Sequence, residues 1–274
     1  MRKHTFFAAL ALLGTFYSAS FGAIFFVDLG GVCLDRSSLK ACYAIGPTQF
    51  FGFYNPFNLD NQLFAFLHAI APRQPETPMA YYQGAIMPQL MCEFMVGDKT
   101  SMEIRTAIAQ AIKKHKKIFS TKHERQLVQT IADFIFNPKS LAQVMTLNHK
   151  TINILKHLHK KTDAAGNRMH AIYILSNWDA ESFPFVQEKF PRLFKYVDGI
   201  IISGVAHCMK PDSAIFSYAF EQFDVNPDSQ LTIFIDDQEE NINAAQQLQK
   251  KQLKPILFKN SSSLKKTLKE WSIW

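Results

Sequence analysis

The amino-acid sequence predicts an α/β protein whose parallel-sheet core is interrupted early by a long helical insertion. Two observations carry this prediction. Short runs of β-branched and aromatic residues alternate with helical stretches in the second half of the chain, as buried parallel strands do. A polar group follows each run, and the carboxyl ends of parallel strands share one edge, where ligands bind. These polar groups are Asp28-Leu-Gly-Gly31, Ser176-Asn177, Lys210-Pro211 and Asp236-Asp237.

Residues 1–22 have the pattern of an export signal. A basic start at Arg2 and Lys3 precedes an almost wholly apolar stretch from Phe6 to Phe16, and small residues follow as far as Gly22. This length approaches the ~18 residues that span a bilayer, so an uncleaved membrane anchor is one alternative and a soluble extension is another. Because a core strand is predicted to start at about Ile24, without a linker, export is favoured. We expect a periplasmic or secreted protein that meets a membrane only through an uncleaved segment.

Composition sets further bounds. A chain of 274 residues, 47% hydrophobic, is long enough to bury a core in one or two domains. Its net charge of +7 favours anionic partners, but the chain contains no nucleic-acid-binding motif, and we expect no nucleic-acid partner. Its cysteines, which lack metal-ligand spacing, are predicted to be free thiols, with a Cys42–Cys92 disulfide as the alternative. They are Cys33, Cys42, Cys92 and Cys208.

The first strand is predicted at about 24–27, and residues 36–147 are predicted to be mostly helical. Apolar residues at helical spacing form three faces: Leu63, Leu67 and Ile70; Ile104, Ile108 and Ile112; Leu127, Ile131 and Phe134. Capping boxes start two helices at Thr100 and Thr121, and Asn137-Pro138 ends the last. We expect this insertion to cover the carboxyl edge of the sheet as a cap that excludes water and selects the substrate.

Helix and strand alternate from residue 148 onward. A helix over 151–160 leads to a strand ending at Leu175, and later strands are predicted at about 199–203, 231–235 and 256–259. A helix over 211–223 is predicted to start with Pro211 in its first position. The predicted core is therefore 23–35 plus 148–274, and the predicted cap is 36–147.

This order of motifs resembles the haloacid dehalogenase (HAD) superfamily, in which a helical cap follows the first strand of a Rossmann-like core. The nearest likeness is to bacterial sugar-phosphate phosphatases and the N-terminal domain of soluble epoxide hydrolase, which share the Asp-x-Gly and Asp-Asp forms of the motifs. The resemblance covers the chain after residue 22, although the cap is recognised only by its position and helicity.

The resemblance implies a Mg²⁺-dependent hydrolase of small phosphate monoesters. Asp28 matches the nucleophile, which forms an aspartyl-phosphate. Ser176 and Asn177 match the phosphate-holding groups, and Lys210 matches the lysine that neutralises the nucleophile and the phosphate.

The resemblance also implies a set of metal ligands. Mg²⁺ prefers oxygen ligands. Asp28, the backbone carbonyl of Gly30 and Asp237 match its direct ligands. Asp236 is expected to help directly or through water, and Asn241 to support the metal or the phosphate. Two adjacent carboxylates at a helix start are also explained by the helix dipole, and the two explanations are compatible.

Gly30 departs from the family pattern. Typical phosphatases of this superfamily carry an aspartate there, which protonates the leaving alcohol and later activates water. General acid–base help is worth ~10²–10⁴-fold, so Gly30 favours substrates that leave easily, such as anomeric sugar, aryl or acyl phosphates. Asp35, Asp179 or a cap residue is a candidate substitute, although structural roles are favoured for the first two.

Two other functions remain open at this point. A catalytically idle HAD-like protein would bind phosphate or another ligand without turnover, and Gly30 would mark its lost chemistry. A haloacid dehalogenase would use the same nucleophile, but the carboxylates at 236–237 argue against it.

Two features of the insertion have plain explanations. The basic run Lys113–Lys117 is more simply a solvated helix face than a device for steering substrates. The aromatics are expected to pack within the insertion rather than line a pocket; they are Phe50, Phe51, Phe53, Tyr54 and Phe57.

Overall fold

A computed structural model describes residues 22–50, 59–74, 78–116, 119 and 121–274. The predicted export signal lies outside these residues except for Gly22, so export and anchoring stay predictions. Phe51, Phe53, Tyr54 and Phe57 also lie outside them. No helix in the described part of the chain is both long and apolar enough to cross a bilayer.

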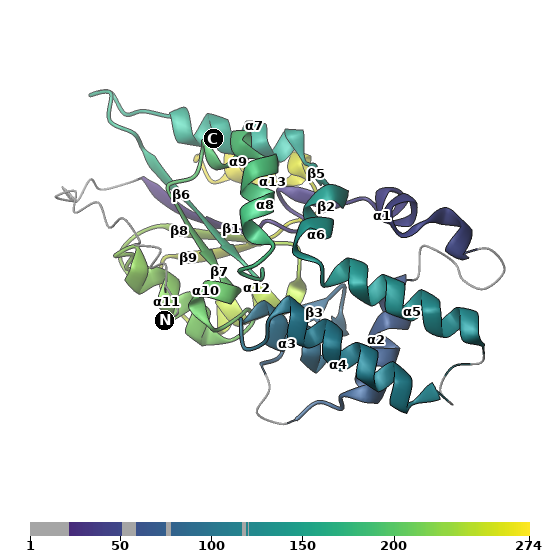
Figure 1. Cartoon of the computed structure of the whole chain (residues 1–274). Coiled ribbons are helices and arrows are strands. Elements are labelled where there is room, and N and C mark those ends of the chain that lie inside the picture. Colours follow the sequence, from purple (N-terminus) through teal and green to yellow (C-terminus); the bar gives the residue numbers. More distant parts are fainter. Residues whose placement is uncertain (1–21, 51–58, 75–77, 117–118, 120) are drawn as a thin grey trace, which may run out of the picture.

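The core is a five-stranded, all-parallel sheet in the order β7-β6-β1-β8-β9 (Figure 1). The α/β fold class is thereby confirmed. The strands are β1 (Ala23–Val27), β6 (His170–Ser176), β7 (Gly199–Ile202), β8 (Thr232–Asp236) and β9 (Leu253–Leu257). All five residues of β1 are buried, because it lies in the middle of the sheet and both its faces are covered.

Helices cover both faces of the sheet, since successive side chains of a strand point to opposite sides. Phe25 packs with α7 (His149–Lys160), α8 (Phe183–Lys189), α9 (Pro191–Phe194) and α13 (Ser261–Glu270). Its neighbour Phe26 packs on the other face with α11 (Ser213–Gln222) and α12 (Glu239–Gln247). A short helix, α10 (Ser203–Ala206), follows β7.

The insertion is mostly helical, as predicted. Its elements are α1 (Ser38–Ile45), the 3-10 helix η1 (Pro47–Phe50), α2 (Leu59–Ile70), α3 (Gln89–Met95), α4 (Ser101–Lys114), α5 (Lys122–Ile135) and α6 (Pro138–Val144). Thr100 forms a complete capping box with Glu103, and the Thr121 side chain accepts from the Glu124 backbone N–H. The apolar faces of α2, α4 and α5 meet in a cluster separate from the core of the sheet.

Two strand pairs interrupt the expected helices. β2 (Leu34–Arg36) and β5 (Met145–Leu147) pair antiparallel where the chain leaves and re-enters the core. The hairpin of β3 (Tyr81–Tyr82) and β4 (Ala85–Ile86) turns at Gln83 and Gly84, both with positive φ, as a two-residue type I′ turn requires.

Three of the predicted boundaries are wrong. The last strand covers 253–257 rather than 256–259, because β9 is an edge strand and tolerates Pro255. Ser203 begins α10 instead of ending β7. The helix predicted over 211–223 starts at Ser213, and the side chain of Asp212 caps it by accepting from the Ala214 N–H. Pro211 therefore precedes the helix, after a cis peptide bond with Lys210.

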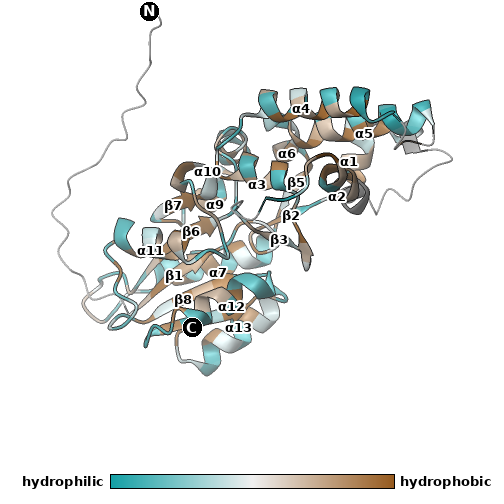
Figure 2. Cartoon of the chain, turned by 90° about the horizontal axis from the view of Figure 1, so that it is seen from below, coloured by the Kyte–Doolittle hydropathy of each residue, from teal (hydrophilic) through white to brown (hydrophobic). Residues whose placement is uncertain are grey.

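The insertion lies against the carboxyl edge of the sheet (Figure 2). Polar contacts hold it there. Ser203 Oγ donates to the Met95 carbonyl at 2.7 Å, and the His207 ring contacts the Val96 carbonyl at 2.9 Å. Lys189 Nζ donates to the Ala142 carbonyl at 2.7 Å. All four cysteines are free, so the alternative Cys42–Cys92 disulfide is not formed.

Candidate active site

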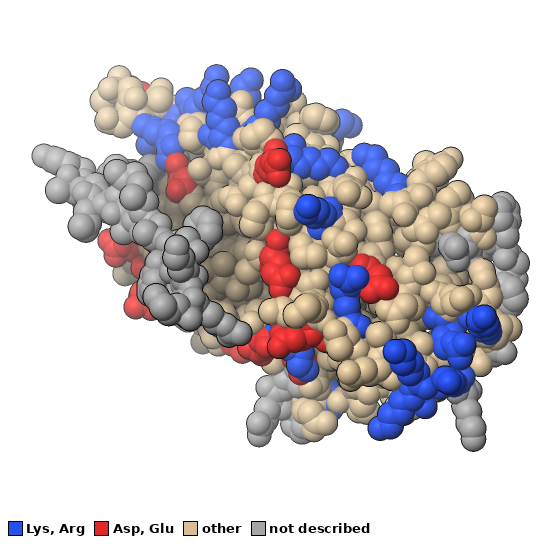
Figure 3. Space-filling view, in the orientation of Figure 1, with Lys and Arg blue, Asp and Glu red and all other residues tan. Residues whose placement is uncertain are grey.

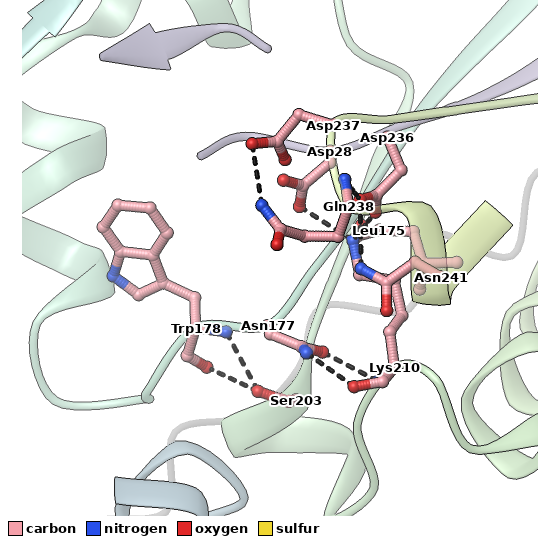
Figure 4. A network of polar contacts seen from close by, with 10 residues as sticks. All are labelled: Asp28, Leu175, Asn177, Trp178, Ser203, Lys210, Asp236, Asp237, Gln238 and Asn241. Carbon is pink, nitrogen blue, oxygen red and sulfur yellow. Dashed lines mark hydrogen bonds and ion pairs between the residues drawn. The ribbon is translucent and has the colours of Figure 1, made fainter. Parts of the chain in front are cut away.

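Lys210 joins the ends of three neighbouring strands. Its ammonium lies 2.8 Å from Asp28 Oδ1, after β1, and 2.6 Å from Asp236 Oδ2, at the end of β8 (Figure 4). It also donates to the Leu175 carbonyl of β6 at 2.8 Å. Lys210 is only 1% exposed, and a buried ammonium of this kind is stable only when it is paired and hydrogen-bonded. Residues far apart in the sequence thus meet at one edge of the sheet.

Negative charge is in surplus at this edge. Carboxylate oxygens of Asp28, Asp236 and Asp237 lie within 4.8 Å of one another. Among the described residues, Lys210 is the one cationic side chain in an ion pair with this cluster. Three carboxylates around one ammonium leave a formal charge of about −2 when all are ionised, which is the charge that one divalent cation neutralises.

The pKa values follow from burial and this charge. Burial raises the pKa of Asp28, against the lowering effect of Lys210. Burial, together with Asp28 and Asp236, raises the pKa of Asp237 to about 7. Burial alone would lower the pKa of Lys210, but Asp236 and Asp28 outweigh it and raise that pKa, so the lysine keeps its charge.

The adjacent aspartates have different surroundings. Both oxygens of Asp236 are occupied, since Oδ2 accepts from Lys210, and Oδ1 accepts from the Gln238 backbone at 2.9 Å and the Asn241 amide at 3.0 Å. Asp237 instead lines the cavity above the sheet, where Gln238 Nε2 donates to its Oδ2 at 2.9 Å. A direct metal contact is therefore easier for Asp237 than for Asp236. Asn241 supports Asp236.

The glycines after Asp28 are not equivalent. Gly31 has φ +74, and a Cβ there would overlap the Asp237 carboxylate, 2.5 Å from its Cγ. The loop after β1 therefore needs glycine at 31 to approach the loop after β8. Gly30 lines the cavity, and a Cβ there would have one neighbour within 4 Å, Asp28 Oδ2 at 3.9 Å. Position 30 thus has room for a side chain.

The groups predicted to hold phosphate lie beside Asp28. Ser176 ends β6 and lines the cavity, and its hydroxyl lowers the pKa of Asp28 against the larger effect of burial. The side chain of Asn177 holds the lysine loop, because its Nδ2 donates to the Lys210 carbonyl and its Oδ1 accepts from the Lys210 N–H, both at 2.8 Å. This amide positions Lys210, and phosphate contact by Asn177 stays a prediction.

The candidate substitutes for the missing acid differ in their availability. Asp179 is buried, and its carboxylate accepts from the backbone N–H and the hydroxyl of Ser182. That use fits the structural role predicted for it. Asp35 in β2 and Asp179 both line the cavity, and burial raises the pKa of each carboxyl group, which favours the protonated form that an acid needs.

Sequence reasoning missed several residues at this site. Trp178 and Gln238 line the cavity. Each directly follows a predicted motif in the sequence, and this position could have identified them as site residues. The hairpin residues Tyr81 and Tyr82 also line the cavity. The short turn sequence Tyr-Tyr-Gln-Gly could have predicted this hairpin. The Gln83 N–H donates to Gln238 Oε1 at 2.9 Å, which links the insertion to the carboxylates.

The cavity has a volume of about 390 Å³ and lies between the sheet edge and the insertion. The described lysines of the basic run do not line it. In Figure 3, blue side chains gather at the lower right, where α4 ends and α5 begins. Lys113 and Lys114 are exposed there, which favours the solvated-face interpretation over steering.

The raised pKa of Asp237 predicts a pH-dependent response to Mg²⁺. Without metal, the protonated form of Asp237 is favoured in the folded state up to about pH 7, so its contribution to stability is lost as pH rises from about 4 through 7. Metal binding requires the carboxylate, so Mg²⁺ affinity should fall as pH falls below 7. We expect Mg²⁺ to raise the Tm more at pH 8 than at pH 6.

Asp237→Asn provides the comparison for this prediction. In EDTA, the Tm of the wild type relative to this variant should decrease with rising pH, and added Mg²⁺ should reverse the decrease. A Mg²⁺-induced Tm shift that is the same at both pH values, or that Asp237→Asn retains in full, would contradict the prediction.

No protein-family model matches the chain, and neither does any curated protein. Solved structures do match. A HAD family enzyme from Bacteroides thetaiotaomicron, in complex with magnesium and inorganic phosphate, has a TM-score of 0.53 and 18% identity over 89% of this chain and 98% of that one. A structure described as a predicted HAD-like family hydrolase from Porphyromonas gingivalis has a TM-score of 0.51 and 20% identity over 91% and 98%.

An L-2-haloacid dehalogenase from Xanthobacter autotrophicus also matches, with a TM-score of 0.48 and 13% identity over 93% and 84%. At such identities the likeness is one of fold. The chain has the fold of the HAD enzymes, a Rossmann-like sheet with a helical insertion after the first strand, and the resemblance seen in its motifs is confirmed at that level. The choice among reactions depends on the site.

Proposed function

We propose that this chain, which has the fold of the HAD hydrolases, is a Mg²⁺-dependent hydrolase of small phosphate monoesters. The observation that carries the proposal is the surplus of carboxylates around Lys210, at the floor of a cavity that also contains the Ser176 hydroxyl. Carboxylates that outnumber their cation are suited to a divalent metal, which together with Lys210 would supply the positive charge that a phosphate dianion needs.

The donor set fits Mg²⁺. Asp28 and Asp237 offer hard carboxylate oxygens at the cavity, and Gly30 lines the same cavity. Asp236 and Asn241 would act behind these ligands, holding Lys210 and each other. When bound, the ion supplies charge neutralisation and polarises the phosphoryl oxygens.

Asp28 is the proposed nucleophile. Lys210 holds its Oδ1, which leaves Oδ2 available to attack phosphorus. In the first step an Asp28 oxygen–phosphorus bond forms while the bond from phosphorus to the ester oxygen breaks, and the alcohol leaves. In the second step water attacks phosphorus, which releases phosphate and restores the carboxylate. Lys210 and Ser176 balance charge on the phosphoryl oxygens in both steps.

Gly30 supplies no proton to the leaving alcohol. A departing alkoxide must then take its proton from solvent or from another cavity group such as Asp35. We therefore expect turnover to depend steeply on the pKa of the leaving group.

Two alternatives compete with this proposal. Gly30 favours a binding protein that holds metal and phosphate without turnover. A dehalogenase is disfavoured, because the departing halide is an anion and the floor of the cavity already carries surplus negative charge.

Phosphate release provides the test. We expect purified protein to release phosphate from aryl phosphates with Mg²⁺, to lose this activity in EDTA and to regain it when Mg²⁺ is restored. Aryl phosphates with a low leaving-group pKa should react fastest. Absence of release from every ester, with Mg²⁺ and phosphate binding intact by calorimetry, would replace the proposal with the binding protein. Metal-independent halide release from a 2-haloacid would replace it with the dehalogenase.

A further inference from the structure

The floor and the roof of the cavity differ in polarity. Its floor, built from the ends of β1, β6 and β8, carries the carboxylates, the ammonium, a hydroxyl and amides. Its roof comes from the insertion and is mainly apolar, and Arg36, Tyr81, Tyr82 and Gln83 are the polar residues that the insertion adds to the lining. The roof residues that matter here are Phe64, Met87, Met91, Met95, Phe136 and Met145.

Packing within the insertion fixes several of the roof residues. Phe64 and Met87 are buried in a small cluster around α2 and α3, and Phe136 is buried in the main cluster of the insertion. The roof therefore belongs to the packing of the insertion and keeps its place. Met91 and Met95, one turn apart on α3, offer polarisable thioethers that adapt to apolar groups of different shape.

Polar groups at the rim of the cavity contact one another. The Tyr81 hydroxyl donates to Met79 Sδ at 3.7 Å, and the Gln83 amide donates to the Tyr82 hydroxyl at 3.5 Å. The Arg36 guanidinium lies 5.5 Å from the centroid of the Tyr82 ring. Part of the hydrogen-bonding capacity of Tyr81, Tyr82 and Gln83 is therefore used within the insertion itself.

From this difference in polarity we propose that the substrate is a phosphate monoester of an apolar alcohol or phenol rather than of a sugar. The inference rests on the proposed function, because it assumes that the phosphate occupies the floor. With phosphate beside Asp28 and Lys210, the rest of the substrate extends toward the roof. Hydroxyl groups would lose water there without gaining partners, whereas methylene groups and rings would gain contacts.

A series of para-alkylphenyl phosphates tests the proposal. Lengthening the alkyl group from methyl to butyl barely changes the leaving-group pKa, so kcat/KM along the series reports contact with the roof. We expect kcat/KM to rise about threefold for each added methylene until the cavity is filled. The matched phosphate with a terminal hydroxyl on the alkyl chain should lose most of that gain.

Met91→Gln places an amide in the roof with little change in side-chain length. This variant should flatten the dependence on chain length, so that kcat/KM falls more for the butylphenyl ester than for the methylphenyl ester. Met102→Gln is the matched control, because Met102 is 74% exposed on α4 and does not line the cavity. It should keep the full dependence on chain length.

Binding of para-alkylphenyl phosphonates, measured by calorimetry, gives a readout that needs no turnover. Phenyl phosphate hydrolysis with no gain along the alkyl series would overturn the substrate inference and leave the phosphatase proposal standing. Absence of hydrolysis, with phosphonate affinity still rising along the series and falling in Met91→Gln, would overturn the phosphatase and keep the apolar ligand. Flat phosphonate affinity as well would overturn both.

Discussion

Asp28→Asn is expected to abolish phosphate release, with a loss in kcat on the order of 10⁴- to 10⁶-fold, because an amide oxygen is a poor nucleophile toward phosphorus. The fold should survive. The substitution keeps the shape of the side chain, and it removes one of three carboxylates that repel one another within 4.8 Å. We therefore expect the Tm of the metal-free variant to equal or exceed that of the metal-free wild type. Phosphate-release assays and thermal unfolding in EDTA check the two parts.

Asp228→Asn is the matched control, since Asp228 makes an exposed ion pair with Lys250 at 2.9 Å, and its removal should leave activity unchanged. Acid-quenched wild type should carry a phosphoryl group on the peptide that contains Asp28, and the same peptide from the Asp28→Asn variant should carry none. Full activity in Asp28→Asn, or a phosphoryl group trapped on another residue, would show that Asp28 is not the nucleophile.

Gly30→Asp is expected to increase activity toward esters with poor leaving groups. A side chain at position 30 enters open space in the cavity, and φ there is compatible with any residue. The new carboxyl group would supply the proton that the departing alkoxide needs, an effect worth about 10²-fold or more on alkyl phosphates. Esters with good leaving groups should gain little, so a plot of log kcat against leaving-group pKa should become flatter.

Gly30→Asn separates acid catalysis from a change of shape, because it fills the same space without a titratable proton. It should leave the leaving-group dependence as steep as in the wild type. Equal behaviour of the two variants would show that position 30 takes no part in proton transfer, and Asp35 would then be the residue to substitute next, as Asp35→Asn.

The arrangement of the core was accessible from the sequence because its strands are buried on both faces. In runs such as Thr232–Asp236 the three middle residues are apolar, and the charged residue at the end marks the edge of the sheet. In an all-parallel sheet those ends must meet, so the proximity of Asp28, Lys210 and Asp236 followed from chain order. Two of the three boundary errors lie at prolines, Pro211 and Pro255.

Other features of the site were not accessible from the sequence, because they depend on how the insertion packs. The apolar spacing of α4 and α5 predicts that each helix buries a face, but it does not say that α3 contributes to the roof or that a short hairpin lines the cavity. The different surroundings of Asp236 and Asp237 likewise depend on hydrogen bonds from Gln238 and Asn241, and neither residue type is diagnostic. Adjacent residues in one motif thus acquire different roles.

The central position of β1 affects how the chain is made. This strand is synthesised before both of its partners, since β6 leaves the ribosome only after the whole insertion has been translated and β8 follows later still. The insertion has its own apolar cluster and nearby partners, so it is able to fold first. Meanwhile the segment Ala23–Val27, apolar throughout, stays without its sheet. We expect it to be the chaperone-binding and aggregation-prone segment of the nascent chain until β8 arrives.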